Sequence, residues 1–197
     1  MPRPTREQID EEILDTAAAL FARHGFAETS VQRVADATGY SKTGLLHRFP
    51  TKDALQAAAL AATLQRVRRV VDGVTASPPG PARDRAALEA LTDLALARPG
   101  FTALALSSVS RGEEQTLPLT ELADALFEAF AAPAPTGTGT ERAVRLTSAL
   151  GGLAIAALAC RALQDAGTVR PLLVDAALGA LGHPTPTAPP TDAVTGA

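Results

Sequence analysis

The side chains best suited to chemistry lie between residues 23 and 52, and they suit the binding of anions. Both lysines of the 197-residue chain, Lys42 and Lys52, fall here among arginine, hydroxyl and imidazole groups. Residues 23–52 carry five basic and two acidic side chains, a local net charge of +3, whereas the whole chain has a net charge of -3. Contact with a phosphate backbone requires only a local basic face.

The elements that must present these side chains are two short helices joined by a tight turn. Ala35 offers a small side chain where a crossing helix packs closely, and Gly39 permits the positive φ of the turn. Residues 29–32 have the form of a capping box for a helix that begins at Thr29. Ser41 is a favourable N-cap for the next helix, which ends by Phe49. The spacing predicts a helix-turn-helix.

The second of these helices has two different faces. Leu45 and Phe49 form an apolar face that must be buried. The opposite face is free for the DNA major groove, because the N-terminal residues of such a helix reach base edges. The residues on that face are Lys42, Thr43, Gly44, Leu46 and His47.

In order and spacing, residues 6–56 resemble the N-terminal domain of tetracycline-repressor-type (TetR family) transcriptional regulators. The stretch that carries the resemblance runs from Gly25-Phe26 through Thr29–Leu55. The resemblance implies an all-helical homodimer whose first three helices bind a double-stranded DNA operator. It also implies a larger C-terminal domain that dimerises and binds a small-molecule effector. A ligand-responsive repressor that reads a palindromic operator is therefore the expected function.

The resemblance also implies roles for single residues. Thr29 and Lys52 would contact phosphates, and His47 would contact the DNA backbone or a base. Tyr40 stands where the family usually has a small aliphatic residue. Leu46 stands where the family commonly has a phosphate-binding Tyr, so that contact is lost or replaced by apolar contact with a thymine methyl. The DNA-binding candidates are Thr29, Arg33, Tyr40, Ser41, Lys42, Thr43, Gly44, Leu46, His47 and Lys52.

Proline and glycine divide the chain into segments of helical length without strand alternation, which predicts an all-α fold of about nine helices. The expected helices are 6–23, 29–38, 41–49, 51–74, 82–97, 101–112, 119–131, 140–166 and 169–181. We expect a DNA-binding domain over residues 1–50 and a ligand-binding and dimerisation domain over residues 51–182. Residues 183–197, which begin at His183, would form a flexible tail rich in Pro, Thr and Ala, with no specific role for that histidine.

Leucine and small residues on the last two helices favour a four-helix dimer interface, although ordinary intrachain packing explains the same pattern. An effector pocket would lie among the fourth to eighth helices. Its candidate residues, each of which equally suits core or surface, are Phe101, Leu104, Ser108, Arg111, Leu126, Phe127, Phe130 and Cys160. A hydrophobic or mixed small molecule would suit these walls.

Several classes are disfavoured by composition. A single Cys excludes a disulfide framework and a multi-cysteine metal site, and the three His are too scattered for a metal triad. No catalytic motif is found, so we expect no enzyme activity, cofactor or metal. The first helix is charged rather than signal-like, and the longest apolar run, 149–160, is too short for a membrane span. A cytoplasmic location follows.

Two other hypotheses remain open at this point. One is a helical ligand-binding or enzymatic protein whose helix-turn-helix is vestigial, for which Leu46 and the acidic total charge are the only support. The other is a purely structural helical dimer, which leaves the basic segment around Lys42 unexplained.

Overall fold

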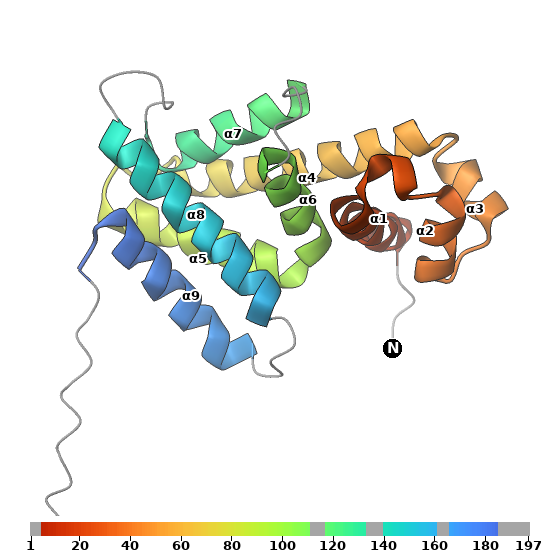
Figure 1. The fold of residues 1–197 in the computed structure, drawn as a ribbon. Coiled ribbons are helices and arrows are strands. Elements are labelled where there is room, and N and C mark those ends of the chain that lie inside the picture. Colours follow the sequence, from red (N-terminus) through yellow and green to blue (C-terminus); the bar gives the residue numbers. More distant parts are fainter. Residues whose placement is uncertain (1–4, 111–116, 133–139, 161–165, 185–197) are drawn as a thin grey trace, which may run out of the picture.

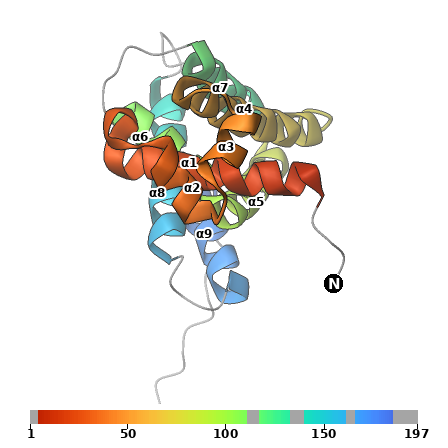
Figure 2. The same cartoon turned by 90° about the vertical axis from the view of Figure 1, so that its right-hand side faces the viewer.

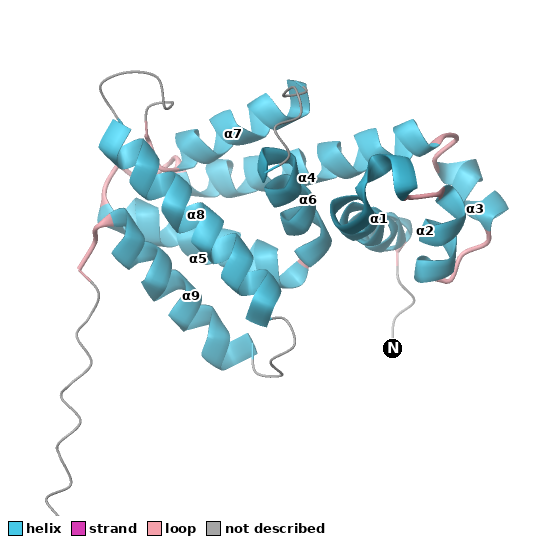
Figure 3. Cartoon of the chain, in the orientation of Figure 1, coloured by secondary structure: helices cyan, strands magenta, loops and turns pink. Residues whose placement is uncertain are grey.

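The computed structural model describes residues 5–110, 117–132, 140–160 and 166–184. Within these ranges the chain forms nine helices and no strand (Figure 3), which confirms the predicted all-α class. The helices are α1 (Arg6–Glu28), α2 (Val31–Thr38), α3 (Lys42–Arg48), α4 (Lys52–Val74), α5 (Pro81–Ala97), α6 (Pro99–Ser110), α7 (Leu117–Ala129), α8 (Thr140–Cys160) and α9 (Ala166–Leu181).

Hydroxyl side chains cap the N-terminal ends of α2, α3 and α4. The Ser41 hydroxyl accepts a hydrogen bond from the Gly44 N–H at 3.0 Å, and Thr51 does the same for the first turn of α4. Gly39 ends α2 with φ 74°, in the left-handed region that the turn requires. The helix predicted to start at residue 29 starts two residues later, at Val31. Ser30 rather than Thr29 is the N-cap, since its side chain accepts from the Arg33 N–H.

Two hydrophobic cores lie along α4. Figure 1 shows α4 running between the helix-turn-helix unit and the C-terminal helices. The C-terminal core is formed by α4, α5, α7, α8 and α9. The N-terminal core unites α1–α3 with the first half of α4 and with α6, and its buried residues are Ile13, Ala17, Ala18, Phe21, Val34, Ala35, Leu45, Leu55, Ala59, Phe101 and Leu104. Helix α6 therefore packs against the helix-turn-helix unit, which Figure 2 shows end-on.

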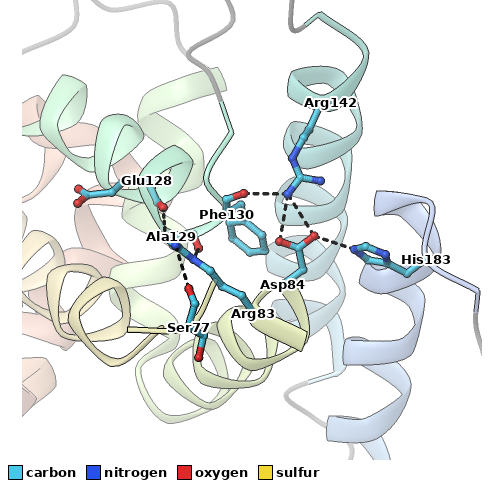
Figure 4. Close-up of polar contacts among 8 residues, drawn as sticks. All are labelled: Ser77, Arg83, Asp84, Glu128, Ala129, Phe130, Arg142 and His183. Atoms are coloured by element: carbon cyan, nitrogen blue, oxygen red, sulfur yellow. Dashed lines mark hydrogen bonds and ion pairs between the residues drawn. The ribbon is translucent and has the colours of Figure 1, made fainter. Parts of the chain in front are cut away.

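A buried polar cluster holds the far end of the C-terminal helices together (Figure 4). The carboxylate of Asp84, which is 1% exposed, accepts from Arg142 at 3.1 Å and lies 2.7 Å from Nε2 of His183. Arg142 also donates to the Phe130 carbonyl at 2.8 Å. Next to it, Arg83 donates to the Ala129 carbonyl at 2.8 Å. One carboxylate thus joins α5 to α8 and to the end of α9.

This cluster corrects the expectation for His183. His183 makes specific contacts, because it lies just after the C-terminal end of α9 and its ring contacts the Asp84 carboxylate. Its N–H donates to the Leu178 carbonyl at 3.0 Å, and Gly182, at φ 90°, makes the turn that places it there. The remainder of the predicted tail, residues 185–197, lies outside the described residues.

Removing the cation from this cluster is expected to destabilise the fold. Arg142→Ala leaves the buried carboxylate of Asp84 without its charged donor, so the free energy of unfolding should fall by about 1–3 kcal/mol. Urea unfolding at neutral pH measures this change. Arg145→Ala is the matched control: its ion pair with Glu141 is exposed, and its loss should cost about 0.5 kcal/mol or less. Equal unfolding free energies for the two variants contradict the prediction.

Candidate nucleic-acid interface

Helix α3 carries the candidate DNA-reading residues on its outward side. Leu45 is fully buried and anchors the helix, whereas Lys42, Thr43 and His47 are exposed. Leu46 is half-buried between the two faces. The short helix thus presents its cationic and hydrogen-bonding groups away from the core, as a helix that enters a groove must.

Backbone geometry at the start of α3 keeps its first turn compact. A Cβ atom on Gly44 would lie 3.1 Å from the Ser41 Oγ that caps the helix, so glycine allows this close approach. Tyr40, which precedes the cap, is 37% exposed. Arg33 on α2 is also exposed, and one of its nitrogens donates to the Glu28 carbonyl at 3.3 Å.

The position of Thr29 corrects its expected role as a phosphate contact. Its side chain is 0% exposed, and its hydroxyl donates to the carbonyls of Gly25 at 2.7 Å and Leu20 at 3.2 Å. A hydroxyl has one proton, which is here shared between two carbonyls of α1. Gly25 exposes its carbonyl because it leaves helical geometry, with φ 81°. Thr29 therefore fastens the kinked end of α1 to the start of α2.

Lys52 also makes internal contacts. Its Nζ donates to the carbonyls of Phe26 at 2.9 Å and Ala27 at 3.2 Å, and it lies 4.2 Å from the centre of the Phe26 ring. A cation at the C-terminal end of a helix satisfies free carbonyls and favours the helix dipole. An ammonium group has three donors, so one remains for a phosphate. The phosphate contact of Lys52 stays a prediction.

The predicted effector-pocket residues do not gather in one place. Phe101 and Leu104 belong to the N-terminal core, where they pack with α1. Leu126, Phe127, Phe130 and Cys160 instead belong to the C-terminal core or pack against it. The side chain of Ser108 and all of Arg111 lie outside the described residues. Phe101 and Leu104 therefore do not line one pocket with the other candidates, because the start of α6 faces the helix-turn-helix unit.

Sequence reasoning missed a set of ion pairs around α1. Asp10 pairs with Arg48 of α3, and Glu11 pairs with Arg66 of α4 and with Arg98. Burial and, to a smaller extent, the charges of Arg98 and Arg69 lower the pKa of Arg66. The partners are far apart in sequence, so no local pattern identifies these pairs.

Comparison with known proteins agrees with this geometry. The model of the family described as "Bacterial regulatory proteins, tetR family" matches residues 13–59, which are the helix-turn-helix unit and the first turns of α4. Residues 13–59 are therefore similar to the DNA-binding domain of this family of transcriptional regulators. No curated protein sequence matches the chain.

Solved structures show the same fold over most of the chain. A TetR-family regulator from Bordetella parapertussis has a TM-score of 0.63 and 20% identity, and the match covers 90% of this chain and 96% of that one. PfmR, a TetR-family regulator from Thermus thermophilus, has a TM-score of 0.57 and 21% identity, with 87% and 97% covered. A relative from Marinobacter aquaeolei has a TM-score of 0.58 and 17% identity, with 89% and 96% covered. These similarities show the fold.

The buried hydroxyl of Thr29 predicts a stability defect rather than a DNA-binding defect. Thr29→Val keeps the side-chain shape but leaves the Gly25 and Leu20 carbonyls without their donor, so the free energy of unfolding should fall by about 1–2 kcal/mol. Thr43→Val, at an exposed position of α3, should leave it nearly unchanged. Thermal or urea unfolding gives the comparison. A fully stable Thr29→Val protein contradicts the internal role.

Proposed function

We propose that this protein is a homodimeric repressor that binds a palindromic DNA operator and responds to a small-molecule effector. The observation that carries the proposal is the exposed row of Lys42, Thr43 and His47 on a capped helix whose opposite face is anchored by Leu45. The match of residues 13–59 to the tetR family model supports DNA binding, and a regulator of transcription would act in the cytoplasm, where bacterial DNA lies.

Recognition would combine a cationic contact with a short row of hydrogen-bonding groups. The Lys42 ammonium and the Thr43 hydroxyl stand at the N-terminal end of α3, which is the end that reaches base edges. Half-buried Leu46 supplies an apolar surface that suits a thymine methyl. The operator should therefore differ from those read by relatives that use a tyrosine hydroxyl at this position.

Loss of the Lys42 charge is expected to weaken DNA binding. A duplex selected from a random double-stranded library serves as the operator, and its affinity is measured against salt concentration. Lys42→Ala should reduce the affinity by about 1–3 kcal/mol and the slope of log affinity against log salt by about 1.

Arg69→Ala is the matched control for this experiment. Arg69 is an exposed cation in the last two turns of α4, 17 residues beyond the start of that helix and roughly 25 Å along it. Its loss should leave the slope unchanged. The proposed interface is wrong if Lys42→Ala and Arg69→Ala have the same affinity and slope, and the proposed function is wrong if the protein enriches no duplex.

An exposed apolar stripe supports the homodimer. Along α8, residues at spacings of three and four, Val144, Ser148, Gly152, Ile155 and Ala159, are all exposed. Val144 and Ile155 are 59% and 58% exposed, and Leu172 on the adjacent α9 is 64% exposed. Small residues let two helices approach closely, so a second copy of α8 and α9 would cover this face in a four-helix arrangement.

The composition of α8 accords with this reading. Within the described residues, it is the single helix long and apolar enough to cross a membrane by length and composition, with 28% of its most apolar window buried inside the chain. Its inward face, which includes Leu146 and Leu153, packs in the C-terminal core. Its outward face is the exposed stripe. A two-sided apolar helix of this kind suits a subunit interface.

A charge in the stripe is expected to separate the subunits. Ile155→Glu should shift the protein from dimer to monomer, because a carboxylate is costly to bury in an apolar interface. Sedimentation equilibrium or light scattering measures the mass. Thr147→Glu is the control, since Thr147 is exposed on the same helix but about 100° away from the stripe. The proposed interface fails if Ile155→Glu retains the wild-type mass, or if the wild-type protein is a monomer.

A dimer explains how one short helix suffices for an operator. Two α3 helices related by a two-fold axis would enter successive major grooves, about 34 Å apart, and would read the two halves of a palindrome. An effector would release the DNA only if it bound the released arrangement more tightly than the bound one. Residues of the C-terminal core that are partly accessible, including Leu126, Phe127 and Cys160, are candidates for contact with it.

A further inference from the structure

Three carboxylates on α1 connect the recognition helix to the C-terminal helices. Asp10, Glu11 and Asp15 lie within six residues of one another. Asp10 contacts α3, whereas Glu11 and Asp15 contact residues at the start of α6 or directly before it. Their partners come from α3, from α4 and from the junction between α5 and α6. The proposed DNA-binding function does not itself account for these contacts, since none of the three carboxylates would attract a phosphate.

The first contact holds the C-terminal end of the recognition helix. Asp10 forms an ion pair with Arg48, the last residue of α3, and the two side chains are 33% and 25% exposed. Leu45 anchors the same helix from its buried face. A seven-residue helix with one buried side chain needs a second point of attachment to keep its direction, and Asp10 provides it from α1.

The other contacts hold α1 against the start of α6. Arg98, directly before α6, donates to Glu11 at 2.7 Å, and Glu11 also pairs with Arg66 of α4. The Asp15 side chain accepts from the Phe101 N–H at 3.0 Å. The backbones are so close that a Cβ atom on Gly100 would lie 1.9 Å from the Asp15 carbonyl oxygen. The start of α6 therefore has no room to slide past α1.

We propose that Asp10, Glu11 and Asp15 make α1 a rigid connector that sets the direction of α3 relative to the start of α6, with Asp10 as the positioning residue for α3. The inference rests on the proposed function, because direction matters only if α3 reads DNA. Partly exposed ion pairs contribute little stability singly. Their effect is on geometry. A rotation of α6 would move α1 with it, and the ion pair between Asp10 and Arg48 would then move α3 away from the groove.

The first test changes Asp10 without changing the DNA-facing residues. Asp10→Asn should lower the ratio of affinities for the selected operator and for a scrambled duplex by about fivefold or more. Glu12→Gln, an exposed neighbour on the same helix, makes the same change of charge and should leave the ratio within twofold of wild type. This control separates lost positioning from the general attraction of DNA to a less acidic helix.

The second test changes the other end of the connector. Arg98→Gln should also lower the affinity ratio, although Arg98 belongs to the α5–α6 junction, whereas Arg69→Gln should not. Amide hydrogen exchange of α3, measured without DNA, should become faster in Asp10→Asn and Arg98→Gln and stay unchanged in both controls. This readout does not depend on DNA binding and is compared among variants that melt at similar temperatures.

The outcomes separate the two proposals. In one outcome the wild-type protein binds the operator specifically, and Asp10→Asn or Arg98→Gln matches wild type in affinity ratio and in α3 exchange. This outcome overturns the connector and leaves the proposed function intact. Wild-type protein that prefers no duplex overturns the proposed function and with it the positioning role of Asp10. A lowered ratio and faster α3 exchange in both variants, with unchanged controls, supports the connector.

Discussion

The close packing of α1 against the start of α6 is the contact on which the arrangement of this molecule depends. Gly100 brings the two backbones together, and the adjacent Phe101 closes the N-terminal core beside α1. Because Phe101 is buried in that core, α6 packs with the helix-turn-helix unit as much as with the C-terminal helices. The fold therefore has two cores that share α4 and α6 rather than two independent domains.

The N-terminal unit uses much of its polar chemistry to hold itself together. Thr29 and Lys52, both predicted from the sequence to contact phosphates, donate hydrogen bonds to partly buried carbonyls at the kinked end of α1. Arg48 pairs with Asp10. The physical reason is that small helices leave many free carbonyls at their ends, and buried carbonyls need donors. Lys42, Thr43 and His47 remain exposed for an external partner.

The C-terminal helices solve a similar problem with a buried carboxylate. Asp84 joins α5, α8 and α9 through Arg142 and His183, while Arg83 satisfies the end of α7. These polar contacts fix the relative positions of helices whose remaining contacts are mostly between Ala, Val and Leu. Apolar packing alone allows one helix to shift slightly along another, whereas directed hydrogen bonds to one carboxylate do not allow such a shift. The exposed stripe on α8 and α9 is thereby held in one shape.

The sequence by itself determined the all-helical class, the helix-turn-helix and the exposed face of α3, because caps, turn glycines and apolar spacing act over a few neighbouring residues. It did not determine which polar groups face inward. Only the tertiary structure decided that Thr29 is buried, that His183 reaches Asp84, 99 residues away, and that Phe101 joins the N-terminal core. These contacts depend on which helices pack together, and the pattern of a few neighbouring residues does not predict that packing.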